Sequence, residues 1–336
     1  MYKPQDFHNL NLWYQPIFWD SFLIGNTKDK EVIVWDMNAN YNLKSILSKD
    51  SDWFTVYRDI LFVEKPEVTE LYNLFEDKIK SASVVKRADG FRLYKEIFTD
   101  DNIIIECENR VKKYSIPELN LIWQVNGELS SRVQVIDGQL IYLEYSPLAS
   151  KFVVSMDMES GNRVWRRNVF EDYIHLIKTN AQYIESFVTA PENSYLVIDD
   201  GSVLKLDLKT GEIEWISTGH PYLQYYKGKL ISINASFHMV LDAADGKLMS
   251  KTSIEDIFKN TPMSPSANFI ISEGKLFCTD VFAARLAILD AMTGECLWTH
   301  KLDVEEGTTI PFKPLLNEDK LYIVDSNGAL HSFSKE

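Results

Sequence analysis

A short motif recurs along the chain and limits the possible fold more than any other feature. In its complete form it has Asp first, Gly four residues later and Trp eight residues later, as in KLDLKTGEIEW at 205–215. Segments 155–165, 240–250 and 288–298 align with it without gaps, although 240–250 has Ser250 in place of Trp. Such self-similarity predicts a chain built from repeated structural units.

Weaker copies extend the pattern towards both ends. Asp36 and Ser115 hold the anchor place in the first half, a further copy is expected within 68–78, and Ser334 holds that place at the far end. These anchors give eight repeats of about 43 residues, with seven still open because the outermost copies are degenerate. The last copy ends before its fourth strand. Residues 9–15 resemble that missing strand, so we expect the N-terminus to complete the last repeat.

Within a repeat, alternating apolar residues predict four short β-strands. One repeat shows them clearly, at 132–136, 139–145, 151–157 and 163–169. Runs rich in Val, Ile, Tyr and Phe are typical of strands, and tight turns such as Asp137-Gly138 separate them. The pattern predicts an all-β, eight-bladed β-propeller with four antiparallel strands per blade. We expect a single domain over 1–336, with its ring closed by the N-terminal strand.

The motif residues have structural roles in this interpretation. An Asp at the end of the third strand can accept hydrogen bonds from N–H groups of the next turn, and Gly can adopt a positive φ there. A Trp on the fourth strand can pack against the neighbouring blade, contributing about 2–3 kcal/mol by burial. We therefore assign structural roles to Asp157, Asp207, Asp290, Trp165, Trp215 and Trp298.

The charge balance favours some partners over others. The chain has 49 acidic and 35 basic side chains, a net charge of −14. Such a surface repels phosphate, so we expect no nucleic-acid and no membrane ligand. It would attract a basic protein, although acidity can also serve solubility alone.

Cysteine usage and the first residues predict a cytoplasmic protein. Separately, we expect the chain to be a monomer when it is free of its partner. Cys107, Cys278 and Cys296 are too few and too widely spaced for a disulfide framework, which favours a reducing compartment. The N-terminal segment contains Asp6 and has no apolar run typical of a signal peptide.

Motifs of catalysis and cofactor binding are missing. The 14 glycines form neither a GxGxxG nor a GxxxxGKS loop, and the six histidines form no HExxH. Asp199 and Asp200 precede Gly201 in an expected turn, and the histidines fall in different repeats. We therefore expect no enzyme activity, no cofactor and no metal, although a metal site assembled from distant residues stays open.

The pattern D-x-x-T-G-x-x-x-W, at Asp207–Trp215 and Asp290–Trp298, resembles the repeat of the pyrroloquinoline-quinone-like propellers. The resemblance is most specific from Lys151 to the C-terminus and implies an eight-bladed propeller. The family that it resembles includes quinone-dependent dehydrogenases, outer-membrane assembly lipoproteins and binding propellers. The enzymes have a vicinal disulfide and calcium-binding residues, and the lipoproteins have an N-terminal lipidated cysteine. This sequence has no Cys-Cys pair and its first cysteine is Cys107, so the resemblance implies a non-enzymatic member.

Function is then expected in the loops. Extra length falls at 189–193, expected between a second and a third strand, and at 253–267, between blades, so both loops should share one face. Loops 280–284 and 303–311 also stand out. Acidic residues mixed with apolar ones suit a face that binds a basic protein, although each could simply be solvated. The candidates are Glu171, Asp172, Tyr173, Glu255, Asp256, Phe258, Asp280, Phe282, Glu305 and Glu306.

These features together predict a non-enzymatic, protein-binding propeller. The most specific hypothesis is an immunity protein that binds and neutralises a cognate basic secreted toxin, because the chain is acidic and has neither an export signal nor catalytic motifs. Two alternatives stay open: a scaffold for assembly of a multiprotein complex, and an enzyme with an unrecognised site in the central cavity.

Overall fold

The structure is a computed structural model in which almost every described residue outside the loops is in a β-strand. It describes residues 2–37, 42–66, 68–75, 78–86, 97–99, 101–107, 110–116, 119–126, 129–144, 152–177, 181–188, 190–220, 222–234, 236–255 and 269–335. These residues form eight four-stranded antiparallel sheets and a short helix, α1 (Val169–Ile177). The predicted fold is confirmed: an all-β, eight-bladed β-propeller with four antiparallel strands per blade.

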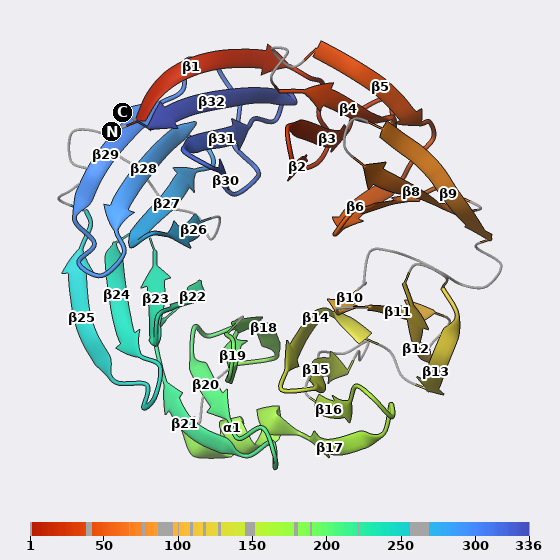
Figure 1. The fold of residues 1–336 in the computed structure, drawn as a ribbon. Coiled ribbons are helices and arrows are strands. Elements are labelled where there is room, and N and C mark those ends of the chain that lie inside the picture. Colours follow the sequence, from red (N-terminus) through yellow and green to blue (C-terminus); the bar gives the residue numbers. More distant parts are fainter. Residues whose placement is uncertain are drawn as a thin grey trace. The chain divides into compact units, whose positions relative to one another are not determined.

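The chain divides into two compact units of four blades each (Figure 1). Unit 1 comprises Met1–Gln124 and Val304–Glu336, and unit 2 comprises Val125–Asp303. The expectation of one domain over the whole chain stays a prediction.

Unit 1 contains the blades whose motif copies are weakest. Its first blade consists of β2 (Ile17–Trp19), β3 (Phe22–Asn26), β4 (Val32–Asp36) and β5 (Asn42–Ser48). The second consists of β6 (Trp53–Tyr57), β7 (Ile60–Glu64), β8 (Val68–Phe75) and β9 (Lys78–Lys86). The third consists of β10 (Ile97–Thr99), β11 (Asn102–Cys107), β12 (Arg110–Ser115) and β13 (Leu121–Asn126). The degenerate copy expected within 68–78 is confirmed, because β8 is the third strand of its blade.

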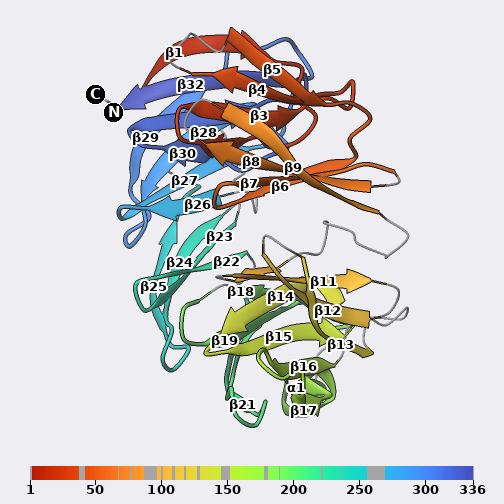
Figure 2. The ribbon, with the colours of Figure 1, turned by 45° about the vertical axis from the view of Figure 1, so that its right-hand side comes forward.

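The last blade of unit 1 takes its fourth strand from the N-terminus. It consists of β30 (Leu315–Asn317), β31 (Lys320–Val324), β32 (Ala329–Lys335) and β1 (Tyr2–Asn9). β1 runs antiparallel to β32, and both ribbon views show the two strands side by side (Figures 1 and 2).

The N-terminal completion is therefore confirmed, but its predicted place at 9–15 is wrong. The Leu12 and Trp13 N–H groups donate to Gly328 O (3.0 Å) and Asn26 O (2.8 Å), so this segment follows the strand and joins the last blade to the first. The Trp13-centred likeness misled because β1 contains no Trp and is specified by its pairing with β32.

Unit 2 contains the clearest repeats. Its blades are β14 (Leu129–Ile136) to β17 (Arg163–Arg167), β18 (Ile184–Val188) to β21 (Ile213–Ser217), β22 (Leu223–Tyr226) to β25 (Leu248–Ser253), and β26 (Phe269–Ser272) to β29 (Cys296–Lys301). The second and third strands are β15 (Gln139–Glu144), β16 (Val153–Asp157), β19 (Ser194–Ile198), β20 (Val203–Leu206), β23 (Lys229–Ile233), β24 (Phe237–Asp242), β27 (Lys275–Asp280) and β28 (Arg285–Asp290). The first strands β14, β18, β22 and β26 contact one another in succession.

The motif turn behaves as its chemistry predicts. Asp207 Oδ1 accepts hydrogen bonds from the N–H groups of Lys209 (2.9 Å) and Thr210 (2.7 Å), and the turn ends at Gly211, whose φ is +71°. The hydrogen bond from the Thr210 N–H is the main reason that the pKa of Asp207 is lowered. Asp290 accepts equivalent hydrogen bonds in its own turn.

The motif Trp residues connect successive blades of unit 2. Trp165 Nε1 donates to Leu208 O (2.8 Å) of the next blade, and Trp215 Nε1 donates to Ala244 O (2.9 Å). Each ring covers the glycine of the next turn so closely that a Cβ at Gly246 would lie 2.5 Å from Trp215. Each glycine therefore meets two requirements: it adopts the positive φ of the turn, and its lack of a Cβ leaves room for the Trp ring.

A histidine replaces the missing tryptophan at the third junction. Ser250 occupies the Trp position on β25, and His238 on the neighbouring strand β24 fills the space instead. His238 Nε2 lies 3.1 Å from Ala291 O, and a Cβ at Gly294 would lie 2.8 Å from the imidazole ring. In this degenerate copy, the contact with the next blade is therefore made by His238 in place of a Trp.

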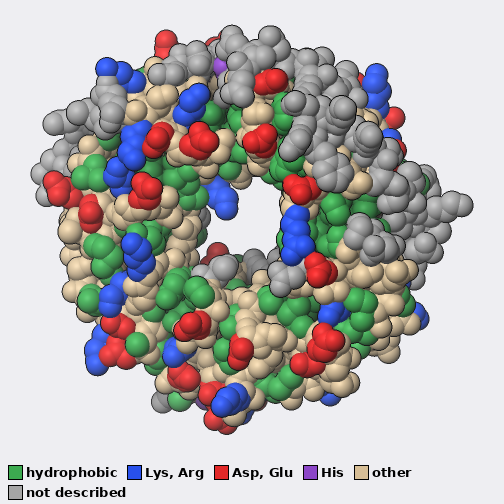
Figure 3. Space-filling view, viewed as in Figure 1, with side chains coloured by type: hydrophobic (Ala, Val, Ile, Leu, Met, Phe, Trp, Pro, Cys, Tyr) green, Lys and Arg blue, Asp and Glu red, His purple; other side chains and the backbone are tan. Residues whose placement is uncertain are grey.

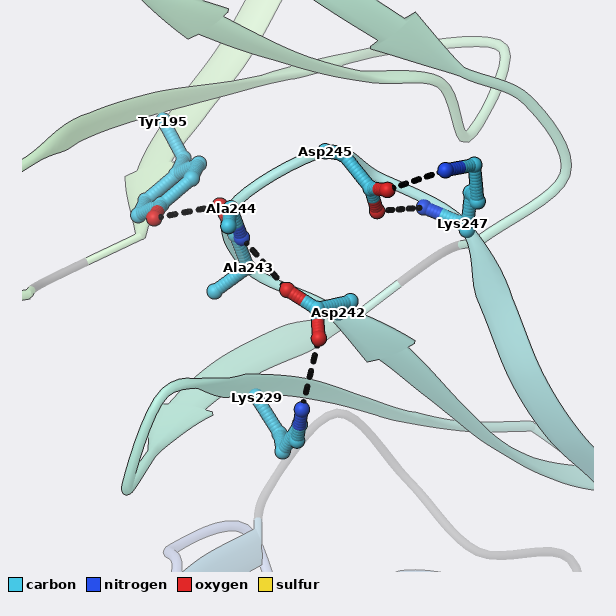
Figure 4. A network of polar contacts seen from close by, with 7 residues as sticks. All are labelled: Tyr195, Lys229, Asp242, Ala243, Ala244, Asp245 and Lys247. Atoms are coloured by element: carbon cyan, nitrogen blue, oxygen red, sulfur yellow. Dashed lines mark hydrogen bonds and ion pairs between the residues drawn. The ribbon is translucent and has the colours of Figure 1, made fainter.

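Further polar contacts fix the turn of that blade, as Figure 4 shows. The Tyr195 hydroxyl from the preceding blade donates to Ala243 O (2.9 Å), and Lys229 Nζ lies 2.7 Å from Asp242 Oδ2. The turn is thus tied both to its own blade and to its neighbour.

Candidate functional site

The two ends of the unit 2 blades differ in the loops they present. At one end, the third–fourth connections and the first–second connections, except the longer one between β18 and β19, are turns that bond to each other, as Ala243 N does to Gly228 O (3.1 Å). At the other end, blade-to-blade segments bond to second–third connections, as Ile254 N does to Ser236 O and Leu302 N to Ala284 O (2.9 Å each). We call this second end the long-loop face. It is the place where loop sequence can vary without disturbing the blades.

Three predicted site residues belong to α1 and not to a loop. The helix begins with a capping arrangement, in which Glu171 N donates to Asn168 Oδ1 (3.2 Å) and Asn168 Nδ2 donates to Glu171 Oε2 (2.9 Å). Glu171 and Asp172 are exposed, and their charges suit the first turn of a helix. The N-x-x-E sequence before an apolar periodic run is the signal from which this helix could have been predicted.

Tyr173 is fully buried, which corrects its place among the binding residues. Its hydroxyl donates to Asp200 Oδ2 and lies 2.9 Å from Ser202 Oγ, both in the turn between β19 and β20. The paired Asp199 and Asp200 belong to this turn, as expected, and Asp199 accepts the Gln182 N–H (3.1 Å). Tyr173 therefore holds α1 on the long-loop face without contacting solvent.

The predicted loop 280–284 does project an aromatic ring. Asp280 is buried, and its Oδ1 accepts the N–H groups of Phe282 (3.1 Å) and Ala283 (3.0 Å). The carboxylate thus shapes the loop, while the Phe282 side chain is 86% exposed. An exposed phenylalanine on a hydrogen-bonded loop is a fixed apolar contact point.

The other predicted site residues are dispersed. Glu255 is exposed beside β25 and accepts a hydrogen bond from Ser236 Oγ (2.6 Å), whereas Asp256 and Phe258 lie outside the described residues. Glu305 and Glu306 are exposed but belong to unit 1.

The prediction that the loop at 189–193 connects a second strand to a third is wrong. It connects β18 to β19, the first and second strands of its blade, and therefore lies at the end opposite the long-loop face. The error arose because the β19–β20 turn at Asp199–Ser202 resembles a first–second turn. Gln134 on the neighbouring β14 donates to Val188 O, Ala190 O and Asn193 O (3.2–3.3 Å), so this loop is held in place by the adjacent blade.

Large apolar side chains are exposed on the long-loop face. Tyr183 precedes β18, Tyr222 precedes β22, Phe282 lies in the β27–β28 loop, and Leu176 lies on α1, with exposures of 41%, 45%, 86% and 63%. The sequence prediction included Phe282 and missed the other three. Such side chains are the usual core of a protein-binding surface.

A pocket of about 250 Å³ opens where the first strands reach this face. It is lined by Glu185 and Ser186 of β18, Val197 of β19, Tyr222 to Gln224 at the start of β22, and Phe269 of β26. Three successive blades therefore contribute to one concavity.

A β-bulge brings an acidic side chain into this pocket. Ile184 faces Ile198 and Ser186 faces Val197, so Glu185 is an extra residue in β18. A bulge redirects side chains, which explains why the adjacent Glu185 and Ser186 both line the pocket. Gln224 Nε2 donates to Phe269 O and links β22 to β26 beside it. Gln134 and Gln224 each lie three residues before a tight turn, a repeated signal that the sequence prediction overlooked.

Other chemistry is sparse in the described part of the chain. These residues include no group of three His, Cys, Asp or Glu side chains arranged to hold a metal ion. In the same residues no helix is long and apolar enough to cross a bilayer. Cys278 is buried on β27, and burial raises the pKa of its thiol. Among the coloured residues of Figure 3, acidic and basic side chains are interspersed on the face shown.

Comparisons with known proteins agree with the repeat interpretation. Residues 238–336 match the family model of outer membrane protein assembly factor BamB, which is a model of pyrroloquinoline-quinone-like repeats, so the predicted repeat is confirmed over these residues. No curated protein sequence matches the chain.

Solved structures with the same fold include natural and designed propellers. BamB from Moraxella catarrhalis has a TM-score of 0.64 and 11% identity, with 100% of both chains covered. Sqt1 from Saccharomyces cerevisiae has a TM-score of 0.65 and 13% identity, covering 99% of this chain and 98% of that one. The computationally designed Ika8 protein has a TM-score of 0.66 and 11% identity, covering 98% and 99%. At these identities the likeness is one of fold.

Proposed function

We propose that this propeller of pyrroloquinoline-quinone-like repeats is a non-enzymatic protein that binds another protein through the long-loop face of unit 2. The observation that supports this most is the exposure of Tyr183, Tyr222 and Phe282 on connections from different blades of one unit. Aromatic side chains at such positions supply contact area at low entropic cost. The pocket beside Tyr222 adds a concave feature to the same face.

The partner in this proposal is basic. The net charge of −14 speeds association with a cationic protein, and the acidic residues Glu185 and Glu255 lie on this face. The finer form of the proposal is an immunity protein that neutralises a cognate basic secreted toxin in the cytoplasm. A scaffold for assembly of a multiprotein complex is the second candidate, because the family model matched by the C-terminal third describes an assembly factor. The two differ in the partner: a toxin kills cells that lack this chain, whereas an assembly component does not.

The face can be tested with two matched surface variants. Tyr183→Ser/Phe282→Ser removes aromatic area from the long-loop face. Leu248→Ser/Met249→Ser removes exposed apolar area from β25 of the same unit, where the two side chains are 49% and 55% exposed. Both variants and the wild type are used to capture partners from host lysate at low salt, with mass spectrometry as the readout. We expect a stoichiometric basic partner that is lost with the first variant and retained with the second. The proposal is contradicted if both variants still capture the partner, or if only the Leu248→Ser/Met249→Ser variant loses it.

A further inference from the structure

The pocket at the ends of β18, β22 and β26 has the composition of a site for one cationic side chain. Among the described residues that line it, Glu185 is the charged one, and no hydrogen bond or ion pair from those residues engages its carboxylate. The Glu185 side chain is half-buried, so its negative charge is less well hydrated than that of a surface glutamate. A partly desolvated carboxylate without a cation gains most from a ligand that supplies one.

The remaining lining residues complement a flat cation with an aliphatic stem. The lining includes two aromatic residues, Tyr222 and Phe269, and two aliphatic ones, Val197 and Leu223; of these four, Tyr222 is the exposed one. Ser186 adds a hydroxyl that can accept a hydrogen bond. The volume of about 250 Å³ suits a single side chain better than a larger ligand.

The backbone around the pocket is fixed in advance of binding. The bulge at Glu185 sets the direction of that side chain, and Tyr222 has a φ of +56°, an uncommon value for a residue with a side chain. Gln224 bridges to Phe269 O, so β22 and β26 are tied together at the pocket. A site whose walls are already ordered loses less entropy when it is filled.

We propose that this pocket receives an arginine side chain of the partner protein, with the guanidinium paired to Glu185 and stacked on Tyr222. Arginine fits better than lysine because its planar guanidinium is weakly hydrated, pairs with carboxylates through two N–H groups and stacks on aromatic rings. The inference rests on the proposed protein-binding function and names the group that the long-loop face recognises.

The test uses a small probe, so that it does not depend on the partner. N-acetyl-L-arginine amide is titrated into the full chain, deuterated and labelled with ¹⁵N, and amide shifts are followed by NMR. A probe of roughly 15 non-hydrogen atoms should bind with roughly millimolar affinity. We expect saturable shifts at Ser186 and Gln224. N-acetyl-L-citrulline amide, a neutral isostere, should bind at least about tenfold more weakly, a loss of about 1.4 kcal/mol.

Two glutamate variants complete the test. Glu185→Gln should weaken binding of the arginine probe at least about tenfold, whereas Glu255→Gln, on the same face, should leave it within about twofold. The inference is overturned by an absence of saturable shifts, by equal binding of the citrulline probe, by an unaffected Glu185→Gln variant, or by tighter binding of N-acetyl-L-lysine amide. Partner capture is measured separately. If the arginine probe does not bind but partner capture still requires Tyr183 and Phe282, the proposed binding face is supported and only the arginine site is rejected.

Discussion

At the scale of single residues, blade junctions of unit 2 depend on a pairing between one ring and one glycine. Trp215 covers Gly246, and its indole N–H reaches a carbonyl of the same turn. Trp165 covers Gly211 in the same way, and His238 covers Gly294. The glycine therefore answers two requirements, a positive φ and the absence of a Cβ.

Gly246→Ala separates these two requirements when it is compared with Gly228→Ala. Both glycines have positive φ, +71° and +76°, but a Cβ at Gly228 meets nothing within 4 Å. We expect Gly228→Ala to lower the free energy of unfolding by about 1–2 kcal/mol through backbone strain. Gly246→Ala should cost about 1–3 kcal/mol more, because the Trp215 ring must move. Urea denaturation measures both, and equal losses would show that the ring contact is not required.

His238 makes stability depend on pH. Burial lowers the pKa of His238 and outweighs the opposing effects of the bond to Ala291 and of Asp290, and Nδ1 is buried without a hydrogen-bond partner. The folded state therefore favours the neutral ring. The unfolded chain takes up a proton below pH about 6.5, so this part of the stability is present above that pH and is lost as the pH falls.

The pH effect can be isolated by substitution. The free energy of unfolding should fall between pH 7 and pH 5 with a slope of up to about 1.4 kcal/mol per pH unit for each such histidine. His238→Gln should make that slope shallower. His220→Gln should remove a second part, because the pKa of His220 is lowered by burial and by Lys251. An unchanged slope in His238→Gln would refute this account.

At the scale of elements, α1 is the one helix among the described residues, and it covers a blade junction on the long-loop face. Val169, Phe170 and Tyr173 are buried, whereas Leu176, near the end of the helix, is exposed. Tyr173 adds a hydroxyl bonded to the β19–β20 turn. The helix is thus attached by apolar packing and by one buried polar contact.

Tyr173→Phe should loosen α1 without displacing its ring. Loss of the hydroxyl removes the bonds to Asp200 and Ser202, so we expect a loss of about 1–2 kcal/mol and faster amide exchange over 169–177. Leu176→Ala, in the same helix but 63% exposed, should change stability by less than about 0.5 kcal/mol. Slower exchange in Tyr173→Phe, or equal effects of both variants, would contradict the assigned role.

At the scale of the whole molecule, the repeat is a strong predictor of architecture and a weak predictor of the site. Strands such as β14 to β17 were predicted closely because alternation of apolar residues is a local property. The third strands were located by their Asp anchors. Glu185 could not be found in this way, since its place in the pocket depends on a bulge and on residues from three blades. Phe282 was found because it is an apolar residue in a loop whose place the repeat pattern indicates.

The same reasoning explains the errors. Tyr173 was predicted to lie in a binding loop because its neighbours Glu171 and Asp172 are acidic. The pair Asn168 and Glu171, which caps the helix, was not considered. The missing Trp at Ser250 was recorded, but its replacement by His238 on the adjacent strand requires the pairing register. Apart from the motif Trp residues, the side chains that act across blades could therefore be assigned only from the structure.

The most direct test of partner binding through the long-loop face is hydrogen exchange of the complex with the captured partner, compared with the free chain. We expect the amides of 182–187 and 281–284 to become protected, and those of β25, at 248–253, to be unchanged. Protection confined to β25 and the other fourth strands, or to unit 1, would contradict the account.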